Sequence, residues 1–214
     1  QVQKQADGLP VYYTEWNGCA TFGAPGNDTR KVAAYDVRAA LSAEDFIEGS
    51  SIWCFSDIFE EIHPFPEEFH GGYGLVTQHG IAKPLFHALR LLGQAGDKRL
   101  ELPGALDGEV IVAAFRDAAD TQLTVLATKQ NLHHFAGQST PATPVEIEVE
   151  LDAKPQSVQL CRIDEEHGNP LKCWQAMGEP EDMTPAQVQR QTHRKDRACH
   201  QRLGFYPHRK GNTA

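Results

Sequence analysis

Two strand-like runs stand out in the pattern of apolar and polar residues. The first, VYYTEW at 11–16, is rich in strand formers and stops near the charged Glu15. The second, SSIWCFS at 50–56, is a short apolar run of the kind that forms a buried strand. A long loop without a periodic pattern follows it as far as residue 80. Glu15 is therefore expected where the first strand ends.

After each run, apolar residues recur at spacings of three and four, as on one face of a helix. The first helical stretch starts with Asp28 or Thr29 as N-cap and closes at Gly49. Its apolar positions are Val32, Tyr35, Ala39, Ala43 and Phe46. The second stretch, at 83–96, has on one face Leu85, Ala88, Leu89 and Leu92. The order strand, helix, strand, helix is typical of parallel sheets with crossover helices.

After residue 97 the pattern changes to alternating strands. An antiparallel pair is predicted from EVIVAAF at 109–115 and QLTVLATK at 122–129, and another from VEIEVEL at 145–151 and SVQLCRI at 157–163. One helix is expected after Pro185. The predicted fold class is α/β plus β. Two β/α units leave open strand edges, so the α/β part requires more strands than the chain contains.

Charge is divided unevenly along the chain. Residues 1–187 hold 13 basic and 28 acidic side chains, whereas residues 188–214 hold 7 basic and 1 acidic. The acidic body argues against nucleic acid as a partner, because phosphate binding requires cations. The basic end has no apolar period or fold motif, so we expect a tail without predicted structure. No apolar stretch approaches membrane-spanning length, and no membrane partner is expected.

The five cysteines are odd in number and scattered, and no two form a CxxC pair. This pattern favours neither a disulfide framework nor a structural zinc site. Together with the absence of a signal-peptide pattern, it predicts a protein of the reducing cytoplasm.

Acids and aromatic rings gather in the loop after the second predicted strand. The acids are Asp57, Glu60, Glu61, Glu67 and Glu68, and the rings include Trp53, Phe59, Phe69 and Tyr73. Because the carboxyl ends of parallel strands share one edge, Glu15 is expected to meet this loop. Ring faces stack on sugar C–H groups and carboxylates accept hydrogen bonds from hydroxyls, so the mixture suits a carbohydrate.

Other interpretations of these residues remain open. A divalent metal is the competing use of the acids, although no EF-hand pattern occurs. Glu67 and Glu68 are expected to form a solvated acidic turn. His70 precedes Gly71 and Gly72, which permit close backbone approach or positive φ, so this trio is a candidate pocket wall.

Several motifs in order resemble the β-xylosidases of glycoside hydrolase family 39. They are YYTEWN, IWCFSDIFEE, FHGGYGLV, GIAKPLFHALRLLGQAG and, nearer the C-terminus, GNPLKCWQAMGEP. The resemblance covers about residues 9–187 and implies a (β/α)8 TIM barrel followed by a β-sandwich. By this likeness residues 1–96 hold barrel units seven and eight and residues 97–187 the β-sandwich unit with a helical extension. The likeness fades after residue 187, and residues 188–214 are expected to be the basic tail.

The resemblance also implies residue roles. Glu15 matches the family's nucleophile at the end of the seventh strand, and Trp53 matches the tryptophan that floors the sugar subsite. The predicted substrate-binding residues are Trp53, Phe59, Glu60, Glu61 and His70. The expected partner is a xyloside or xylo-oligosaccharide, without a cofactor or metal, and a homo-oligomer is compatible with the resemblance.

One family motif is missing from the chain. The family's acid/base glutamate lies in an Asn-Glu-Pro motif on the fourth strand, and this tripeptide does not occur in the 214 residues. Retaining hydrolysis needs two carboxyl groups, one attacking the anomeric carbon and one protonating the leaving oxygen. The chain would thus carry the nucleophile of a retaining glycosidase without its usual proton donor. The alternative is a non-catalytic sugar-binding or structural remnant of such an enzyme.

Overall fold

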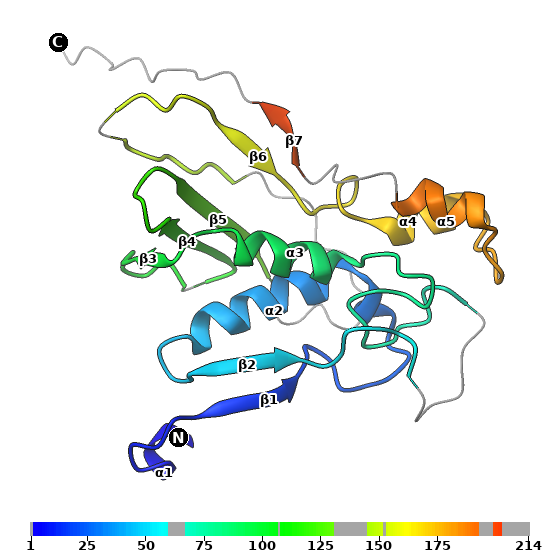
Figure 1. Cartoon of the computed structure of the whole chain (residues 1–214), viewed down its shortest axis with the longest axis horizontal. Helices are drawn as coiled ribbons and strands as arrows, with labels where there is room; N and C mark the ends of the chain where they lie inside the picture. Colours follow the sequence, from blue (N-terminus) through cyan, green and yellow to red (C-terminus); the bar gives the residue numbers. More distant parts are fainter. Residues whose placement is uncertain are drawn as a thin grey trace.

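A computed structural model describes residues 2–59, 67–106, 108–130, 145–151, 153–192 and 199–202. Its first elements are α1 (Val2–Gln5), β1 (Tyr12–Trp16), the 3-10 helix η1 (Pro25–Asp28), α2 (Arg30–Ala43), β2 (Gly49–Ile52) and α3 (Pro84–Gly93). They are followed by β3 (Lys98–Leu100), β4 (Val110–Arg116), β5 (Leu123–Lys129), β6 (Gln159–Cys161), α4 (Pro170–Ala176), α5 (Pro185–Thr192) and β7 (Cys199–Arg202). Figure 1 shows their arrangement.

The strands β1 and β2 lie side by side and parallel, with Tyr12 opposite Gly49 and Trp16 opposite Ile52 (Figure 1). The helix α2 connects them and α3 follows, which confirms the predicted order of strand, helix, strand and helix. The first four residues of β1 are exposed, because in the described part of the chain β1 pairs only with β2. The sheet therefore has an open edge.

The second strand is shorter than its sequence pattern predicted. β2 ends at Ile52, and the peptide bond between Trp53 and Cys54 is cis. The expectation of a strand over 50–56 is thus wrong beyond Ile52, because the chain leaves the sheet there and its residues bond to the loop at 73–76 instead.

The helix α2 begins at Arg30 and is capped by Thr29, whose Oγ1 accepts a hydrogen bond from the Lys31 N–H at 3.2 Å. It ends at Ala43, so the prediction that it continues to Gly49 is wrong, and Phe46 in the following turn is 56 % exposed. The buried face consists of Val32, Ala33, Asp36, Val37 and Leu41. This face is rotated from the predicted one, because the apolar period passed over the polar Asp36, which the fold buries.

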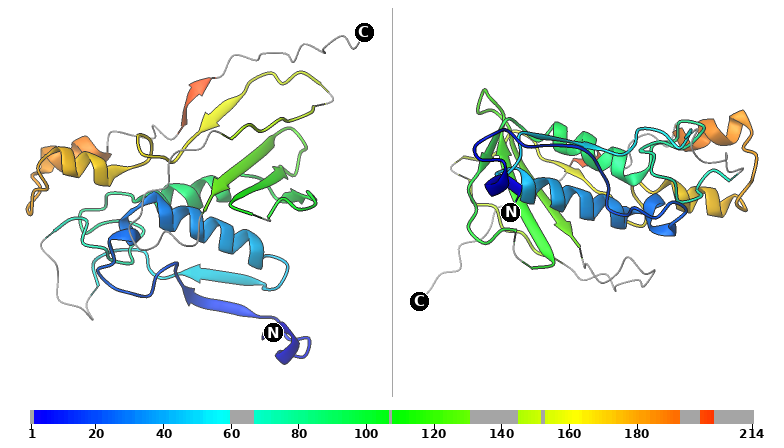
Figure 2. Two further views of the ribbon diagram at one scale, coloured as in Figure 1. Left: turned by 180° about the vertical axis from the view of Figure 1, so that it is seen from behind. Right: turned by 90° about the horizontal axis from the view of Figure 1, so that it is seen from below.

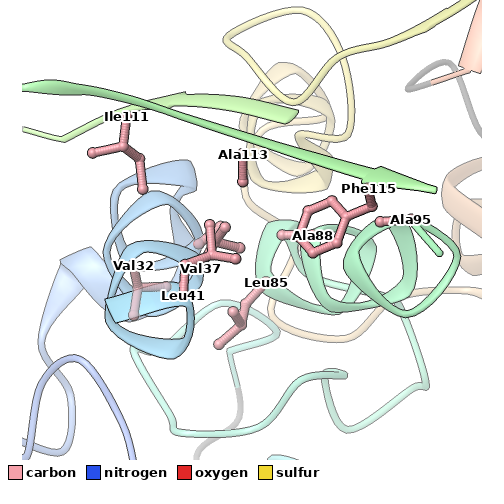
Figure 3. Packing of buried hydrophobic residues seen from close by; sticks show 10 residues of the cluster. Val32, Val37, Leu41, Leu85, Ala88, Ala95, Ile111, Ala113 and Phe115 are labelled. Atoms are coloured by element: carbon pink, nitrogen blue, oxygen red, sulfur yellow. The ribbon is translucent and has the colours of Figure 1, made fainter. Parts of the chain in front are cut away.

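The main hydrophobic core lies where both helices meet β4. Leu85 and Ala88 of α3 are buried as predicted, and Leu89 and Leu92 are partly buried against the same cluster. Figure 3 shows side chains of α2 and α3 pointing toward Ile111, Ala113 and Phe115 of β4. The helices are therefore covered by β1 and β2 on one side and by the sheet that contains β4 on the other, as Figure 2 shows from behind.

The sheet that contains β4 has the order β3-β4-β5 and is antiparallel throughout. This confirms the predicted pair of 109–115 and 122–129, while β3 was not predicted. The second predicted pair is wrong. Residues 145–151 form no strand, and β6 pairs antiparallel with β7 instead. The apolar residues of 145–151 are each at least 39 % exposed, so their alternation has no face to pack against.

The C-terminal helices pack against the long loop between β2 and α3. Trp174 of α4 is buried against Phe69, with ring centroids 5.5 Å apart, and Ile81 and Met183 complete this second cluster. The helix α5 confirms the prediction after Pro185, whereas α4 was not predicted. The second cluster thus packs the C-terminal helices onto the loop between β2 and α3.

Cysteine chemistry differs in part from the expectation. Cys19, Cys54 and Cys173 are free thiols, whereas Cys161 is disulfide-bonded, which the scattered pattern did not predict. A disulfide runs counter to a reducing compartment, and the cytoplasmic location stays a prediction. No helix of the described ranges has both the length and the apolar composition required to cross a bilayer.

Candidate functional site

The carboxyl ends of β1 and β2 are joined by backbone and side-chain hydrogen bonds. The Trp53 N–H donates to the Trp16 carbonyl at 2.8 Å, and Asn17 Nδ2 donates to the Trp53 carbonyl at 3.1 Å. Glu15 precedes Trp16 directly, at the exposed end of β1. The predicted strand-end acid and the predicted subsite tryptophan thus belong to one edge of the sheet.

Five half-buried rings form a continuous group beside this edge, which we call the aromatic cluster. Its members are Phe22, Trp53, Phe59, His70 and Tyr73. Trp53 meets Phe59 edge-on with centroids 5.7 Å apart, and Tyr73 meets Phe22 edge-on at 5.2 Å. His70 lies 5.5 Å from Phe22. The structure therefore brings together the predicted residues Trp53, Phe59 and His70.

Sequence reasoning missed Phe22 as a member of this cluster. It lies in the turn between β1 and η1, in the segment ATFGAPGND, and the rings that it contacts come from residues more than 35 positions away. The signal that could have indicated Phe22 is its position just after the predicted strand end, since loops that follow parallel strands often contain site residues. Tyr73 is held to the same turn, because its hydroxyl donates to the Ala20 carbonyl at 2.7 Å.

The loop between β2 and α3 has two arms joined by backbone hydrogen bonds. Cys54 donates to the Tyr73 carbonyl at 3.2 Å, and Leu75 donates back to the Cys54 carbonyl at 3.0 Å. Val76 donates to the Phe55 carbonyl, and Asp57 donates to the Val76 carbonyl. These bonds hold the segment that follows Trp53 against the segment that follows His70.

Two of the loop's acids face inward. The Asp57 side chain is fully buried beside Lys83, and burial raises its pKa although Lys83 opposes this effect. Glu68 is also fully buried and accepts hydrogen bonds from Thr77 and His79. The expectation of a solvated turn is wrong for Glu68 and right for the exposed Glu67. A buried carboxylate with such partners serves the loop's structure.

The remaining predicted acids, Glu60 and Glu61, lie outside the described residues. In the described ranges no group of three or more His, Cys, Asp or Glu side chains is arranged to hold a metal ion.

The glycines after His70 meet the predicted need for close approach. Gly71 has φ +79°, and a Cβ built there would lie 2.6 Å from the Ala24 carbonyl oxygen. A Cβ at Gly72 or Gly74 would overlap Asp57. The HGG segment is thus confirmed as tightly packed backbone next to the aromatic cluster, because no side chain fits at these positions.

A further buried acid lies beneath the end of β1. Asp36 of α2 is fully buried, and burial raises its pKa from 3.8 to about 7. Neither carboxylate oxygen has a hydrogen-bond partner among the described residues. A Cβ at Gly18 would lie 2.6 Å from Asp36 Oδ1, so the turn after β1 rests on this carboxyl group.

The strand-end acid, the aromatic cluster and the β-α-β-α order agree with a glycoside hydrolase. The model of the family "Glycosyl hydrolases family 39" matches residues 1–202. The chain belongs to this family.

Its relatives and structural neighbours include named β-xylosidases. It is 33 % identical over 172 residues to a β-xylosidase of Geobacillus stearothermophilus, covering 80 % of this chain and 32 % of the relative. It is 32 % identical over 195 residues to one of Caldicellulosiruptor saccharolyticus, covering 87 % and 38 %. A solved GH39 β-xylosidase from Caulobacter crescentus superposes with TM-score 0.74 and 25 % identity, covering 95 % of this chain and 43 % of that one. The chain spans about a third of the length of the two curated relatives.

Proposed function

We propose that this chain is the nucleophile-bearing part of a retaining β-xylosidase, with Glu15 as the nucleophile. The observation that carries the proposal is the linkage of the two strand ends. The residue after Glu15 accepts a hydrogen bond from Trp53, and Trp53 opens the aromatic cluster. A carboxylate at a strand end that is hydrogen-bonded to a ring-bearing segment can meet a sugar's anomeric carbon while the rings contact the apolar face of the sugar.

The proposal includes a larger (β/α)8 barrel, to which β1–α2 and β2–α3 contribute the seventh and eighth units. Support comes from the open edge of β1 and from the greater length of the β-xylosidase relatives. By the complete enzyme we mean this chain together with the preceding β/α units. The sheets β3-β4-β5 and β6-β7 would belong to the appended β-sandwich.

In the proposed mechanism the Glu15 carboxylate attacks the anomeric carbon of a β-xyloside and the glycosidic bond to the leaving oxygen breaks. A carboxylic acid from the preceding units donates its proton to that oxygen. The same group, now a carboxylate, takes a proton from water, and the water oxygen displaces Glu15 from the sugar. Two successive displacements retain the anomeric configuration. The chain's own part is to supply the attacking oxygen.

The other predicted site residues are proposed to bind the sugar. Trp53 would stack on the sugar ring, with Phe59 and His70 beside it in the aromatic cluster. Glu60 and Glu61 would accept hydrogen bonds from sugar hydroxyls, as the family motif FEE suggests. The absence of nucleic-acid partners and the oligomeric state stay predictions.

Covalent trapping tests the proposed nucleophile directly. A 2-deoxy-2-fluoro-xyloside with a good leaving group forms a glycosyl ester on the nucleophile and slows its hydrolysis, because the fluorine destabilises the oxocarbenium-like transition state. After trypsin digestion of the complete enzyme, mass spectrometry is expected to find the sugar on the peptide of residues 5–30, at Glu15. A Glu67→Gln variant, altered at an exposed acid, serves as the labelled control. Label on another carboxylate would refute the assignment.

A non-catalytic remnant is the second candidate, favoured by the missing Asn-Glu-Pro motif and by the exposure of Glu15. The isolated chain distinguishes the two candidates when it is assayed with an aryl β-xyloside that needs little protonation of its leaving group. Turnover that Glu15→Gln removes supports the enzyme. Binding of xylose without turnover, in the chain and in the complete enzyme alike, supports the remnant.

A further inference from the structure

The side chain of Lys83 is buried between two carboxylates. Its Nζ lies 2.6 Å from Asp28 Oδ1 and 2.6 Å from Asp57 Oδ2, and it donates to the Gly72 carbonyl at 3.1 Å. None of the three side chains is more than 2 % exposed. We call these three residues the ion triad. Its lysine forms an ion pair with each carboxylate and donates a hydrogen bond to the glycine backbone.

Each carboxylate also binds the backbone after His70. Asp28 Oδ2 accepts from the Gly71 N–H at 2.6 Å, and Asp57 Oδ1 accepts from the Gly74 N–H at 2.8 Å. The ion triad thus joins the end of η1, the segment after β2 and the residue that precedes α3. These segments have no strand pairing with one another beyond isolated bridges at Ser56–Val76 and Val76–Ala82 in the described part of the chain. The charge-assisted hydrogen bonds of the ion triad therefore add to the backbone hydrogen bonds that hold these segments together.

The glycine backbone packs directly on the ion triad. Asp57 fills the space that a Cβ of Gly72 or Gly74 would need, so the backbone at these positions cannot shift toward Asp57. A change in the position of Asp57 or Lys83 would consequently be passed to residues 71–74. Well-packed interiors transmit such displacements because they contain little free volume.

Members of the aromatic cluster extend from the segments that the ion triad joins. His70 and Tyr73 flank Gly71 and Gly72, and Tyr73 contacts both Phe22 and Phe59. Phe59 follows Asp57 by two residues and contacts Trp53. The ion triad is thus connected to Trp53 through Phe59, which follows Asp57 along the chain and also contacts Tyr73.

We propose that Lys83 and its two aspartates position the aromatic cluster for sugar binding, with Lys83 as the central positioning residue. The inference rests on the proposed function for the identity of the ligand. The ion triad has one positive charge for two carboxylates. Removal of the lysine charge leaves two like charges buried and close together, which must separate or take up protons. Either response releases the glycine backbone and the rings attached to it.

The test compares two variants of the ion triad with a matched control. Lys83→Met removes the cation and keeps an unbranched side chain that is one atom shorter, and Asp57→Asn keeps the shape but removes one negative charge. Lys172→Met is the control, because Lys172 is 51 % exposed and pairs at the surface with Glu166. Two measurements are made. Steady-state kinetics gives kcat and KM of the complete enzyme on an aryl β-xyloside, and near-UV circular dichroism is recorded for the 214-residue chain. A Trp53→Phe partner of each variant gives a difference spectrum that reports Trp53 alone.

For Lys83→Met we expect KM to rise about tenfold with kcat changed by less than about threefold, because ground-state binding to the rings is what is lost. The Trp53 difference spectrum is expected to weaken. Asp57→Asn should raise KM and weaken the Trp53 difference spectrum to a smaller extent. Lys172→Met should change neither quantity. A raised KM with a nearly unchanged kcat indicates that the rings are displaced. A general loss of folded enzyme would instead lower the apparent kcat.

An unchanged KM together with an unchanged Trp53 difference spectrum in a folded variant overturns the inference. If Lys83→Met does not fold, Asp57→Asn decides by the same two measurements, since it retains the Asp28–Lys83 pair. A wild-type complete enzyme without turnover refutes the proposed function instead. In that case the difference spectra still decide whether the ion triad positions Trp53.

Discussion

Substitution of Glu15 by alanine is expected to lower kcat of the complete enzyme on an aryl β-xyloside by at least about 10⁴-fold, or about 5.5 kcal/mol in the activation barrier. Without the carboxylate, water must attack the anomeric carbon directly and no covalent intermediate forms. KM should change little, since the proposed sugar-binding residues remain. Steady-state kinetics with a chromogenic leaving group measures both values.

Azide distinguishes a lost nucleophile from a damaged fold. In Glu15→Ala, azide can occupy the vacated space and attack the anomeric carbon as the aglycone leaves, giving the α-xylosyl azide with inverted configuration. We expect azide to restore part of the activity of Glu15→Ala and to leave Glu67→Ala, altered at an exposed acid, unaffected. Substantial activity of Glu15→Ala without azide would contradict the assignment of Glu15.

The second large effect is expected at Asp36 and concerns stability. The folded chain holds the pKa of this carboxyl at about 7, against 3.8 for an ordinary aspartate. Between these two values the folded state binds a proton that the unfolded state has lost, so stability falls as pH rises from about 4 to 7 and stays low above that. The raised pKa corresponds to a cost of about 4 kcal/mol above pH 7, as an upper estimate.

Asp36→Asn removes the ionisable group and keeps its shape. The variant is expected to be more stable than the wild-type chain at pH 8, by roughly 2–4 kcal/mol, and to lose this advantage near pH 4. Urea unfolding of the 214-residue chain at several pH values measures the difference. The matched control, Asp45→Asn at an exposed position after α2, should show no comparable trend. Equal pH profiles for wild type and Asp36→Asn would disprove the interpretation.

Local patterns predicted the elements that depend on a period or a cap. The α3 face with Leu85 and Ala88 and the pair of β4 and β5 follow from apolar spacing alone. Thr29 caps α2 as its residue type suggests. The prediction failed where an apolar alternation had nothing to cover, as at 145–151, whose side chains are exposed while β6 pairs with β7. An apolar period indicates that a segment could bury one face, but it does not indicate which other segment would cover that face.

Part of the candidate site was also accessible from sequence. Glu15 was predicted at a strand end from VYYTEW, and the structure ends β1 one residue later. Trp53, Phe59 and His70 were selected by motif, and they do share one aromatic cluster. For Glu68 the sequence prediction is wrong, because two adjacent glutamates resemble a solvated turn although one of them is buried against Thr77 and His79.

By itself the sequence determined the order of β1, α2, β2 and α3, the glycine pair after His70 and the acid at the end of β1, because each depends on neighbours within a few positions. Only the tertiary structure decided that Lys83 pairs with Asp28 and Asp57, that Phe22 joins the rings and that Asp36 is buried without a partner among the described residues. The ion triad, for example, depends on which segments meet across 26 to 55 positions of chain. Burial and ion pairing depend on contacts between these distant segments, and no local pattern of residues predicts such contacts.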